Sequence, residues 1–438
     1  MASFGTLSIR YGKDLIRKRA RIGAASANAF SSVTTQTSDD DSELESRSCQ
    51  NATDDRLISF AQRWTTNVTS KKKRRKAINS STKAARSFSD YYRALYGSER
   101  WDGDGADGLC HALMEGPTCH AALINRLHND IIPCKKSGMK PIPWVRSMNT
   151  NLDSVWIEEG MGRLPTPTLC PSTSLLIYYC LDPASLLPVI ALNLPQYIAS
   201  YNTPAKILDM CAAPGGKTLA ILQSLFGGTA QTSNSANEDD VHHVIVANES
   251  SRKRRNRLEN ILADYVPLSI QRSSLVVTGV YGTMFASGSI DPQRGLHYSP
   301  ESDISPRSEE EEGYTHVLCD VPCSGERYVL RSSSSLAQWN AGSSKHLQKK
   351  QLSLLNAAVK ACRPGGQVVY STCSINTNEN DVVVEKLLSK RGNQVEAELD
   401  VLADVGIGES TKYGKMILPD HISCKGMGPM YVCALRKK

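Results

Sequence analysis

Short apolar runs alternate with longer helical patterns over the second half of the chain. Five runs are typical of buried strands, three segments repeat apolar residues every three or four positions, and residues 430–435 offer a last strand. This alternation predicts an α/β fold with a mostly parallel sheet covered by helices on both faces. The expected strands are residues 206–210, 243–247, 275–278, 315–319 and 367–370, and the expected helices are residues 219–225, 252–265 and 349–361.

The pattern before residue 171 is different. Aromatic and apolar residues between positions 88 and 96 recur at spacings of three and four, which predicts an amphipathic helix, whereas residues 125–168 show no clear periodicity. We therefore predict an irregular N-terminal module at residues 71–170 and an α/β domain at residues 171–438. Two polar segments of that domain are expected to be surface insertions, residues 229–241 and 286–313.

Charge is concentrated at the start of the chain. Six Lys or Arg residues against one Asp give residues 1–38 a net charge of +5, out of +7 for the whole chain. A basic segment rich in Ser and Ala is typical of an import presequence, although a disordered basic tail has the same composition. Residues 39–70 begin acidic and Ser-rich and are expected to be a disordered linker. No apolar run approaches the roughly 20 residues of a membrane span.

The 13 cysteines contain no Cys-x-x-Cys pair. Without such pairs or a secretory signal, neither a disulfide framework nor a zinc site is expected, and we predict no metal. Most of these cysteines should be small buried residues, and we assign Cys319, Cys362 and Cys211 to that group.

Residues 207–218 have the sharpest local pattern. An apolar strand enters a loop with adjacent glycines, Gly215 and Gly216, and an apolar helix follows. Glycines permit positive φ and close approach of a ligand to the amides of a helix start. The spacing matches neither a dinucleotide fingerprint nor a Walker loop, and a plain strand-to-helix turn has a similar form. The next strand ends near Glu249, which can bind the ribose hydroxyls of an adenosine-type cofactor or serve as a helix N-terminal acid.

Two further cysteines, Cys323 and Cys373, lie just beyond the carboxyl ends of two expected strands. A lone cysteine is usually structural. Here both thiols are expected at the edge where a cofactor binds, and Asp320 precedes one of them, so chemistry is the better interpretation.

These motifs resemble those of the Sun-domain (NOL/NOP/Sun) family of RNA cytosine-5 methyltransferases. The resemblance covers residues 176–438 and implies a Rossmann-like class I S-adenosylmethionine-dependent fold with a mostly parallel seven-stranded sheet and an irregular N-terminal extension. Its motifs are Asp182-x-Ala184-Ser185, the Cys211-Ala-Ala-Pro-Gly-Gly-Lys217 loop, Asp320-x-Pro-Cys323 and Ser-Thr-Cys373-Ser.

The resemblance implies a role for each candidate residue. Cys373 is the expected nucleophile, Cys323 the thiol that assists release, and Asp320 the contact to the base. Cytosine C5 is a poor nucleophile, and a thiolate added to C6 makes it enamine-like and able to accept a methyl group. The expected residues for binding S-adenosylmethionine are Cys211, Ala212, Ala213, Pro214, Gly215, Gly216, Lys217, Thr218, Glu249, Arg254, Gly282 and Asp320.

Two positions depart from the family pattern. Glu249 stands where an Asp is usual, and Tyr281 stands where an Asp is expected to contact the adenine. The second change keeps open a catalytically silent RNA-binding or ribosome-assembly factor. DNA cytosine methyltransferases are a further alternative, but the cysteine after the fifth strand favours the RNA class.

Within the family, the chain most resembles the mitochondrial ribosomal RNA member. This implies small-subunit rRNA as the substrate, an mTERF-type protein as a possible partner, and the mitochondrial matrix as the location, with no membrane association. The cluster at residues 71–76, six consecutive Lys or Arg residues, then favours RNA contact within an RNA- or partner-binding module at residues 71–170. A nuclear localisation signal and a solvated charge run are the alternatives.

Overall fold

The computed structural model describes eleven stretches of the chain, residues 39–68, 70–103, 108–127, 139–142, 144–145, 152, 155–158, 164–201, 203–227, 243–287 and 313–438. The expected presequence, the first expected insertion and residues 288–312 of the second lie outside these stretches. The described residues divide into two units between Ser48 and Cys49. Within the described stretches, no helix combines the length and the apolar character that crossing a membrane requires.

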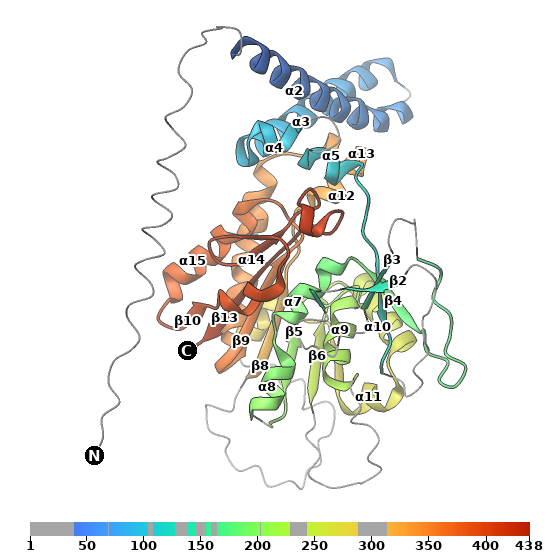
Figure 1. Ribbon diagram of the computed structural model, residues 1–438, viewed down its shortest axis with the longest axis vertical. Coiled ribbons are helices and arrows are strands. Elements are labelled where there is room, and N and C mark those ends of the chain that lie inside the picture. The colour runs from blue at the N-terminus through green and yellow to red at the C-terminus, as the bar shows by residue number, and fades with distance from the viewer. Residues whose placement is uncertain are drawn as a thin grey trace, which may run out of the picture. The chain divides into compact units, whose positions relative to one another are not determined.

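A nine-stranded sheet forms the core of the second unit (Figure 1). Its strands are β5 (Lys206–Asp209), β6 (Val244–Asn248), β7 (Leu275–Thr278), β8 (Tyr314–Asp320), β9 (Cys362–Thr372), β10 (Val395–Ala397), β11 (Glu409–Ser410), β12 (Lys415–Ile417) and β13 (Met430–Lys437). The order is β11-β12-β13-β9-β8-β5-β6-β7, with β10 also paired to β13. Strands β9, β8, β5, β6 and β7 are parallel, whereas β10 to β13 pair antiparallel. The mostly parallel central sheet is confirmed. The expected count of seven strands is wrong for the described residues, because the short strands β10 and β11 extend the C-terminal side.

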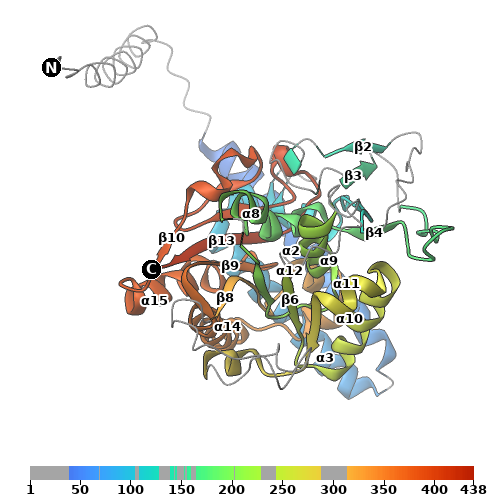
Figure 2. The ribbon, with the colours of Figure 1, turned by 90° about the horizontal axis from the view of Figure 1, so that it is seen from below.

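Apolar residues of the central strands alternate between two cores. In β8, Leu318 belongs to the core that contains Leu258 of α10, while its neighbours Val317 and Cys319 belong to the core that contains Leu354 of α14. Successive strand residues point to opposite faces, so the sheet is buried on both sides, as a run of apolar residues predicts. Figure 2 shows the strands between α14 and α15 on one side and α10 and α11 on the other. The helices around the sheet are α7 (Leu187–Ile190), α8 (Leu194–Tyr201), α9 (Gly216–Phe226), α10 (Arg252–Tyr265), α11 (Leu268–Ser273), α12 (Glu326–Leu330), α13 (Ser333–Ala337), α14 (Gly342–Ala361) and α15 (Asp381–Arg391).

Helices also occupy the N-terminal region. Its helices are α2 (Asp39–Gln62), α3 (Lys71–Tyr96), α4 (Ser98–Asp102) and α5 (Leu109–Met114). The expected amphipathic helix is confirmed in α3, where Phe88 and Tyr92 are completely buried one turn apart. The expected disordered linker at residues 39–70 is wrong over α2, because Leu57 and Ala61 are completely buried in the same core as Phe88. This contact depends on tertiary packing, which the polar local sequence does not reveal.

A small antiparallel sheet has two of its four strands, β2 and β3, in the region without clear periodicity. Its order is β2-β3-β1-β4, and β1 pairs with β4 along four residues. Strands of three or four residues are too short to show an alternating pattern, which is why the sequence did not predict them. Strand β4 ends beside Asp182, one of the motif residues. The strands are β1 (Ala121–Ile124), β2 (Met139–Pro141), β3 (Val155–Glu158) and β4 (Tyr178–Leu181).

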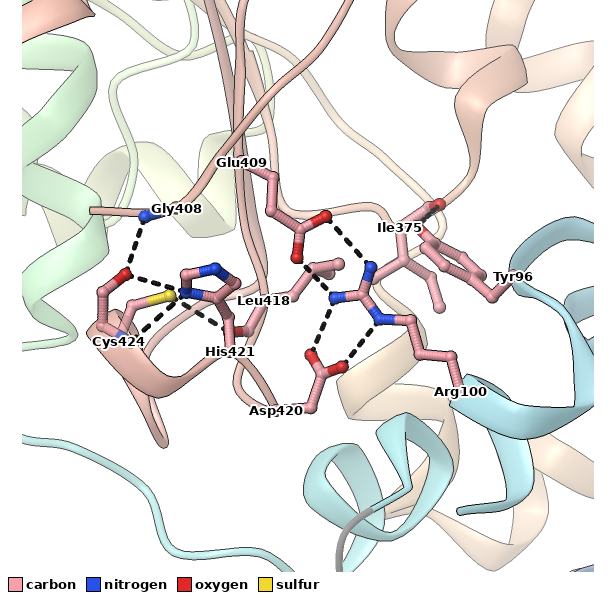
Figure 3. Close-up of polar contacts among 10 residues, drawn as sticks. Tyr96, Arg100, Ile375, Gly408, Glu409, Leu418, Asp420, His421 and Cys424 are labelled. Atoms are coloured by element: carbon pink, nitrogen blue, oxygen red, sulfur yellow. Dashed lines mark hydrogen bonds and ion pairs between the residues drawn. The ribbon is translucent and has the colours of Figure 1, made fainter. Parts of the chain in front are cut away.

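Arg100 of α4 joins the N-terminal helices to the C-terminal strands (Figure 3). Its guanidinium donates to both oxygens of Glu409 at 2.5 and 3.0 Å, and to both oxygens of Asp420 at 2.8 and 3.3 Å. Nearby, the Tyr96 hydroxyl donates to the carbonyl of Ile375 at 2.6 Å. A planar guanidinium suits two such carboxylates better than an ammonium group does. The helices α3 and α4 are therefore fixed both to the C-terminal strands and to the segment after Cys373.

Candidate active site

Three loops meet at the carboxyl edge of the parallel strands. Strands β5, β8 and β9 are neighbours, with Asp209 paired to Leu318 and Asp320 paired to Ser371. Parallel pairing places the ends of these strands side by side, so the glycine loop and the segments carrying Cys323 and Cys373 come together, as the sequence predicted.

The two loop glycines are required by the backbone and by close neighbours. Gly215 has a φ of +122° just before α9, where a Cβ would lie 3.2 Å from Leu258 and 3.1 Å from Ile261 of α10. A Cβ on Gly216 would lie 2.7 Å from the ring of Tyr179. Side chains at either position would therefore displace α10 or β4. The start of α9, whose free N–H groups attract anions, is held next to β4 in this way.

A cavity of about 210 Å³ opens beside this loop. Asp209 contributes a buried carboxyl, whose Oδ2 accepts a hydrogen bond from Thr218 at 2.7 Å while Oδ1 has no hydrogen-bond partner. Burial raises the pKa of Asp209 to about 7, although the Thr218 hydrogen bond opposes this shift. Six of the seven loop residues from Cys211 to Lys217 line the cavity, and Gly215 does not. The lining residues are Tyr179, Cys180, Leu181, Asp182, Ser185, Asp209, Cys211, Ala212, Ala213, Pro214, Gly216, Lys217 and Asp320.

Glu249 and Arg254 are connected to the back of the loop. The Glu249 side chain is buried, its Oε1 accepts the amide of Ser251 at 2.9 Å, and its Oε2 lies 3.3 Å from Nε of Arg254. Arg254 also donates to the carbonyl of Ala213 at 2.8 Å. Neither residue lines the cavity. Glu249 thus makes the helix N-terminal contact that was one of its two sequence interpretations, and Arg254 links it to the loop.

Tyr281 and Gly282 lie outside the cavity lining. The Tyr281 side chain is 73% exposed. Gly282 is buried, and a Cβ there would lie 2.7 Å from Leu354 and 3.2 Å from Met210. Gly282 therefore permits close packing of α14 against the end of β5.

The two candidate thiols are adjacent. Sγ of Cys323 lies 2.8 Å from Sγ of Cys373, and the Cys373 amide donates to Sγ of Cys323 at 3.3 Å. Cys373 is exposed, whereas Cys323 is partly covered. The side-chain hydrogen bond between the two sulfurs, together with burial, raises the pKa of Cys323 well above its usual value. Cys319 and Cys362 are at most 1% exposed, so their assignment to the core is confirmed. The same assignment is wrong for Cys211, which is only partly buried because it lines the cavity.

An ion pair connects the cavity to the thiols. Lys217 Nζ lies 2.9 Å from Asp320 Oδ2, and Ser371 donates to Asp320 Oδ1 at 2.7 Å. Burial lowers the pKa of Lys217, but the charges of Asp320 and Asp209 and the nearby Cys373 thiol raise it overall. Lys217 is therefore a cation close to the cavity, the acid and the exposed thiol.

Sequence patterns missed two buried acids of this site. Asp209 ends β5 immediately before the loop, and this position could have identified it. Glu326 is completely buried and accepts a hydrogen bond from Tyr92 at 2.6 Å, across 234 positions of sequence. No local pattern predicts that contact. Within the described stretches, no group of three or more His, Cys, Asp or Glu residues is arranged to hold a metal ion.

Comparison with known proteins identifies the family. The family model of the 16S rRNA methyltransferases RsmB/F matches residues 300–436. The 5-cytosine rRNA methyltransferase NSUN4 of Mus musculus is 31% identical over 316 residues, which cover 69% of this chain and 71% of NSUN4. The chain belongs to the family of RNA cytosine-5 methyltransferases. The mitochondrial tRNA (cytosine(34)-C(5))-methyltransferase of Mus musculus is 30% identical over 284 residues, covering 62% of this chain and 68% of that protein.

A solved structure supports the same fold. The crystal structure of NSun6 from Pyrococcus horikoshii with SFG has a TM-score of 0.51 at 16% identity, covering 80% of this chain and 98% of that one. The Rossmann-like class I methyltransferase fold is thus confirmed. As a member of this family, the protein is an S-adenosylmethionine-dependent RNA cytosine-5 methyltransferase.

Proposed function

We propose that this methyltransferase modifies cytosine in mitochondrial small-subunit rRNA through a covalent bond between Cys373 and C6 of the base. The observation that carries the proposal is the pair of thiols, Cys323 and Cys373, 2.8 Å apart beside the Lys217–Asp320 ion pair. One thiol is exposed and the other has a raised pKa, so the two are suited to different steps.

Cys373 is proposed as the nucleophile. Its exposed sulfur can reach a base that has left its stack, and the Lys217 ammonium attracts the negative charge that the sulfur carries when it attacks. The sulfur lone pair forms the S–C6 bond while the C5–C6 π electrons shift toward C4 and N3, and the enamine that results makes C5 nucleophilic. Asp320, fixed by Ser371 and Lys217, is proposed to hydrogen-bond the N3/N4 edge of cytosine during this attack.

Cys323 is proposed to assist release. After methyl transfer the C5 proton passes to solvent water, and the electron pair of the broken C5–H bond restores the C5–C6 double bond and expels the Cys373 sulfur. The raised pKa of Cys323 keeps this thiol protonated at neutral pH, and its position lets it donate to the departing sulfur. The covered thiol is thus poised for proton transfer rather than for attack.

The glycine loop is proposed to hold the cofactor. S-adenosylmethionine, when bound, supplies the methyl group. The partnerless Oδ1 of buried Asp209 suits the ammonium end of an amino acid, and the start of α9 suits a carboxylate. Glu249, held by Arg254, is proposed for the ribose side, and the segment at Gly282 for the adenine side.

The rRNA substrate and the mitochondrial matrix are proposed from the likeness to NSUN4 and from the basic composition of residues 1–38. Residues 71–76 begin α3 and are exposed. Six cations at a helix N-terminus oppose the helix dipole, so a polyanion such as RNA would stabilise them. An mTERF-type protein remains a proposed partner.

The substrate is tested with labelled S-adenosylmethionine and two transcripts from the same mitochondria, small-subunit rRNA and tRNA. We expect labelled 5-methylcytosine in the rRNA and at least about tenfold less in the tRNA, which corresponds to about 1.4 kcal/mol of discrimination. Nucleoside analysis after digestion measures both. Equal labelling, or labelling of tRNA alone, would contradict the proposed substrate.

The affinity for S-adenosylmethionine is expected to increase between pH 6 and pH 8. Only ionised Asp209 attracts a cationic ligand, and with a pKa of about 7 its ionised fraction increases from about 0.1 at pH 6 to about 0.9 at pH 8. The apparent affinity should therefore increase about tenfold over this range. Calorimetric titration of S-adenosylmethionine at both pH values measures it. Asp209→Asn should remove most of the increase, and an unchanged increase in this variant would exclude Asp209 as its source.

A further inference from the structure

A buried carboxylate joins the two thiol-bearing loops. Glu326 begins α12, three residues after Cys323, and its side chain is completely buried. It accepts a hydrogen bond from Ser324 of the Cys323 loop. On the Cys373 loop it accepts from the Ser374 hydroxyl at 3.2 Å and from the Ile375 amide at 3.0 Å. One side chain therefore fixes the position of each loop relative to the other.

Helix α3 completes this arrangement from the N-terminal region. The Tyr92 hydroxyl is a further donor to Glu326, at 2.6 Å. One turn on, Tyr96 donates to the Ile375 carbonyl at 2.6 Å, and the Tyr91 hydroxyl lies 3.2 Å from Oδ1 of Asn376. Two tyrosines of this helix thus contact residues that closely follow the proposed nucleophile, and the third, Tyr92, holds Glu326. Helix α3 ends about 75 residues before the α/β domain at residues 171–438 begins. That domain by itself therefore does not contain the tyrosines that make these contacts.

The charge of Glu326 also distinguishes the two thiols. The side-chain hydrogen bond between the two sulfurs and burial are the largest causes that raise the pKa of Cys323, and the negative charges of Cys373 and Glu326 raise it further. A negative charge beside a thiol disfavours its thiolate. With Glu326 only three residues from Cys323, the covered thiol stays protonated and the exposed thiol is left to attack.

We propose that Glu326, anchored to α3 through Tyr92, is a positioning residue. It fixes the two thiol-bearing loops relative to each other, so that Cys373 rather than Cys323 attacks the base. The proposal rests on the proposed roles of Cys323 and Cys373. Glu326 is buried away from solvent and acts through the loops rather than by contact with RNA or cofactor. Small displacements of a reacting group cost large factors in rate, which is why a buried anchor matters.

The test uses the full chain with Glu326→Gln and Tyr92→Phe. Glutamine keeps the size of the side chain, but removes the charge and turns one acceptor into a donor. Tyr92→Phe removes only the hydrogen bond from Tyr92 to Glu326, and it provides the test if Glu326→Gln does not fold. Tyr197→Phe is the matched control, because its hydroxyl contacts Thr203 and Arg363 near the opposite end of β9. Steady-state methylation gives kcat and KM, and iodoacetamide followed by peptide mass spectrometry gives the share of alkylation on each thiol.

For Glu326→Gln we expect kcat to fall about 10- to 100-fold with KM for S-adenosylmethionine within twofold, and the Cys323 share of alkylation to rise at least about threefold. Tyr92→Phe should lower kcat and raise the Cys323 share of alkylation as well, but by smaller factors. An unchanged alkylation ratio, with activity falling no more than in Tyr197→Phe, would overturn the proposal. Alkylation requires no methyl transfer, so it tests Glu326 even if the proposed substrate is wrong.

Discussion

Cys373→Ala is expected to abolish methyl transfer, with a loss of at least about 1,000-fold in kcat/KM. Without the sulfur no bond to C6 can form, and C5 of cytosine is too weak a nucleophile to accept the methyl group. Cys323 cannot substitute, because its thiol is partly covered and its pKa is raised. Incorporation of labelled methyl groups into rRNA, followed by nucleoside analysis, measures the loss.

The control for this variant is cofactor binding. Cys373 does not line the cavity beside the glycine loop, so S-adenosylmethionine should bind Cys373→Ala within about twofold of the wild type. Cys49→Ala removes a cysteine of helix α2 that is far in sequence from both thiol loops, and should retain full activity. Activity of Cys373→Ala within tenfold of the wild type would contradict the assignment of the nucleophile.

Cys323→Ala is expected to stop the reaction after the covalent bond has formed. The adduct can still form through Cys373, but the proton donor 2.8 Å from the departing sulfur is gone. Turnover should fall at least about 100-fold, which is within the usual contribution of a positioned acid or base. A protein–RNA adduct should accumulate and appear as a slower band on a denaturing gel.

The double variant provides the contrast for this result. Cys323→Ala combined with Cys373→Ala should give no slower band, because no nucleophile remains. A slower band of equal strength in the double variant, or normal turnover in Cys323→Ala, would exclude the proposed release step.

Local patterns were sufficient to predict the sheet edge and the thiols. Apolar runs marked β5 and β8, and the glycines after β5 and the cysteines after β8 and β9 followed directly from them. Parallel strands end at one edge, so the amino-acid sequence alone was enough to place the separate motifs around Gly215, Cys323 and Cys373 together. Their chemical roles depended on the family resemblance and remain proposals.

Contacts between distant segments could not be predicted in the same way. Tyr92 reaches Glu326 across 234 positions, and Arg100 reaches Glu409 across 309. The aromatic spacing of α3 indicated a buried face, but not what that face covers. The helix α2 was missed because its sequence is polar, with only isolated residues such as Leu57 buried by tertiary packing.

The central claim is that Cys373, rather than Cys323, bonds to cytosine. Its most direct test is to incubate the wild-type protein with S-adenosylmethionine and small-subunit rRNA containing 5-fluorocytosine. This base carries fluorine in place of the C5 proton whose loss releases the enzyme, so the covalent adduct persists. Digestion and mass spectrometry then identify the cysteine that carries the methylated nucleotide. We expect it on the peptide containing Cys373. A nucleotide on the peptide containing Cys323 would contradict the account, because the covered thiol would then be the one that attacks.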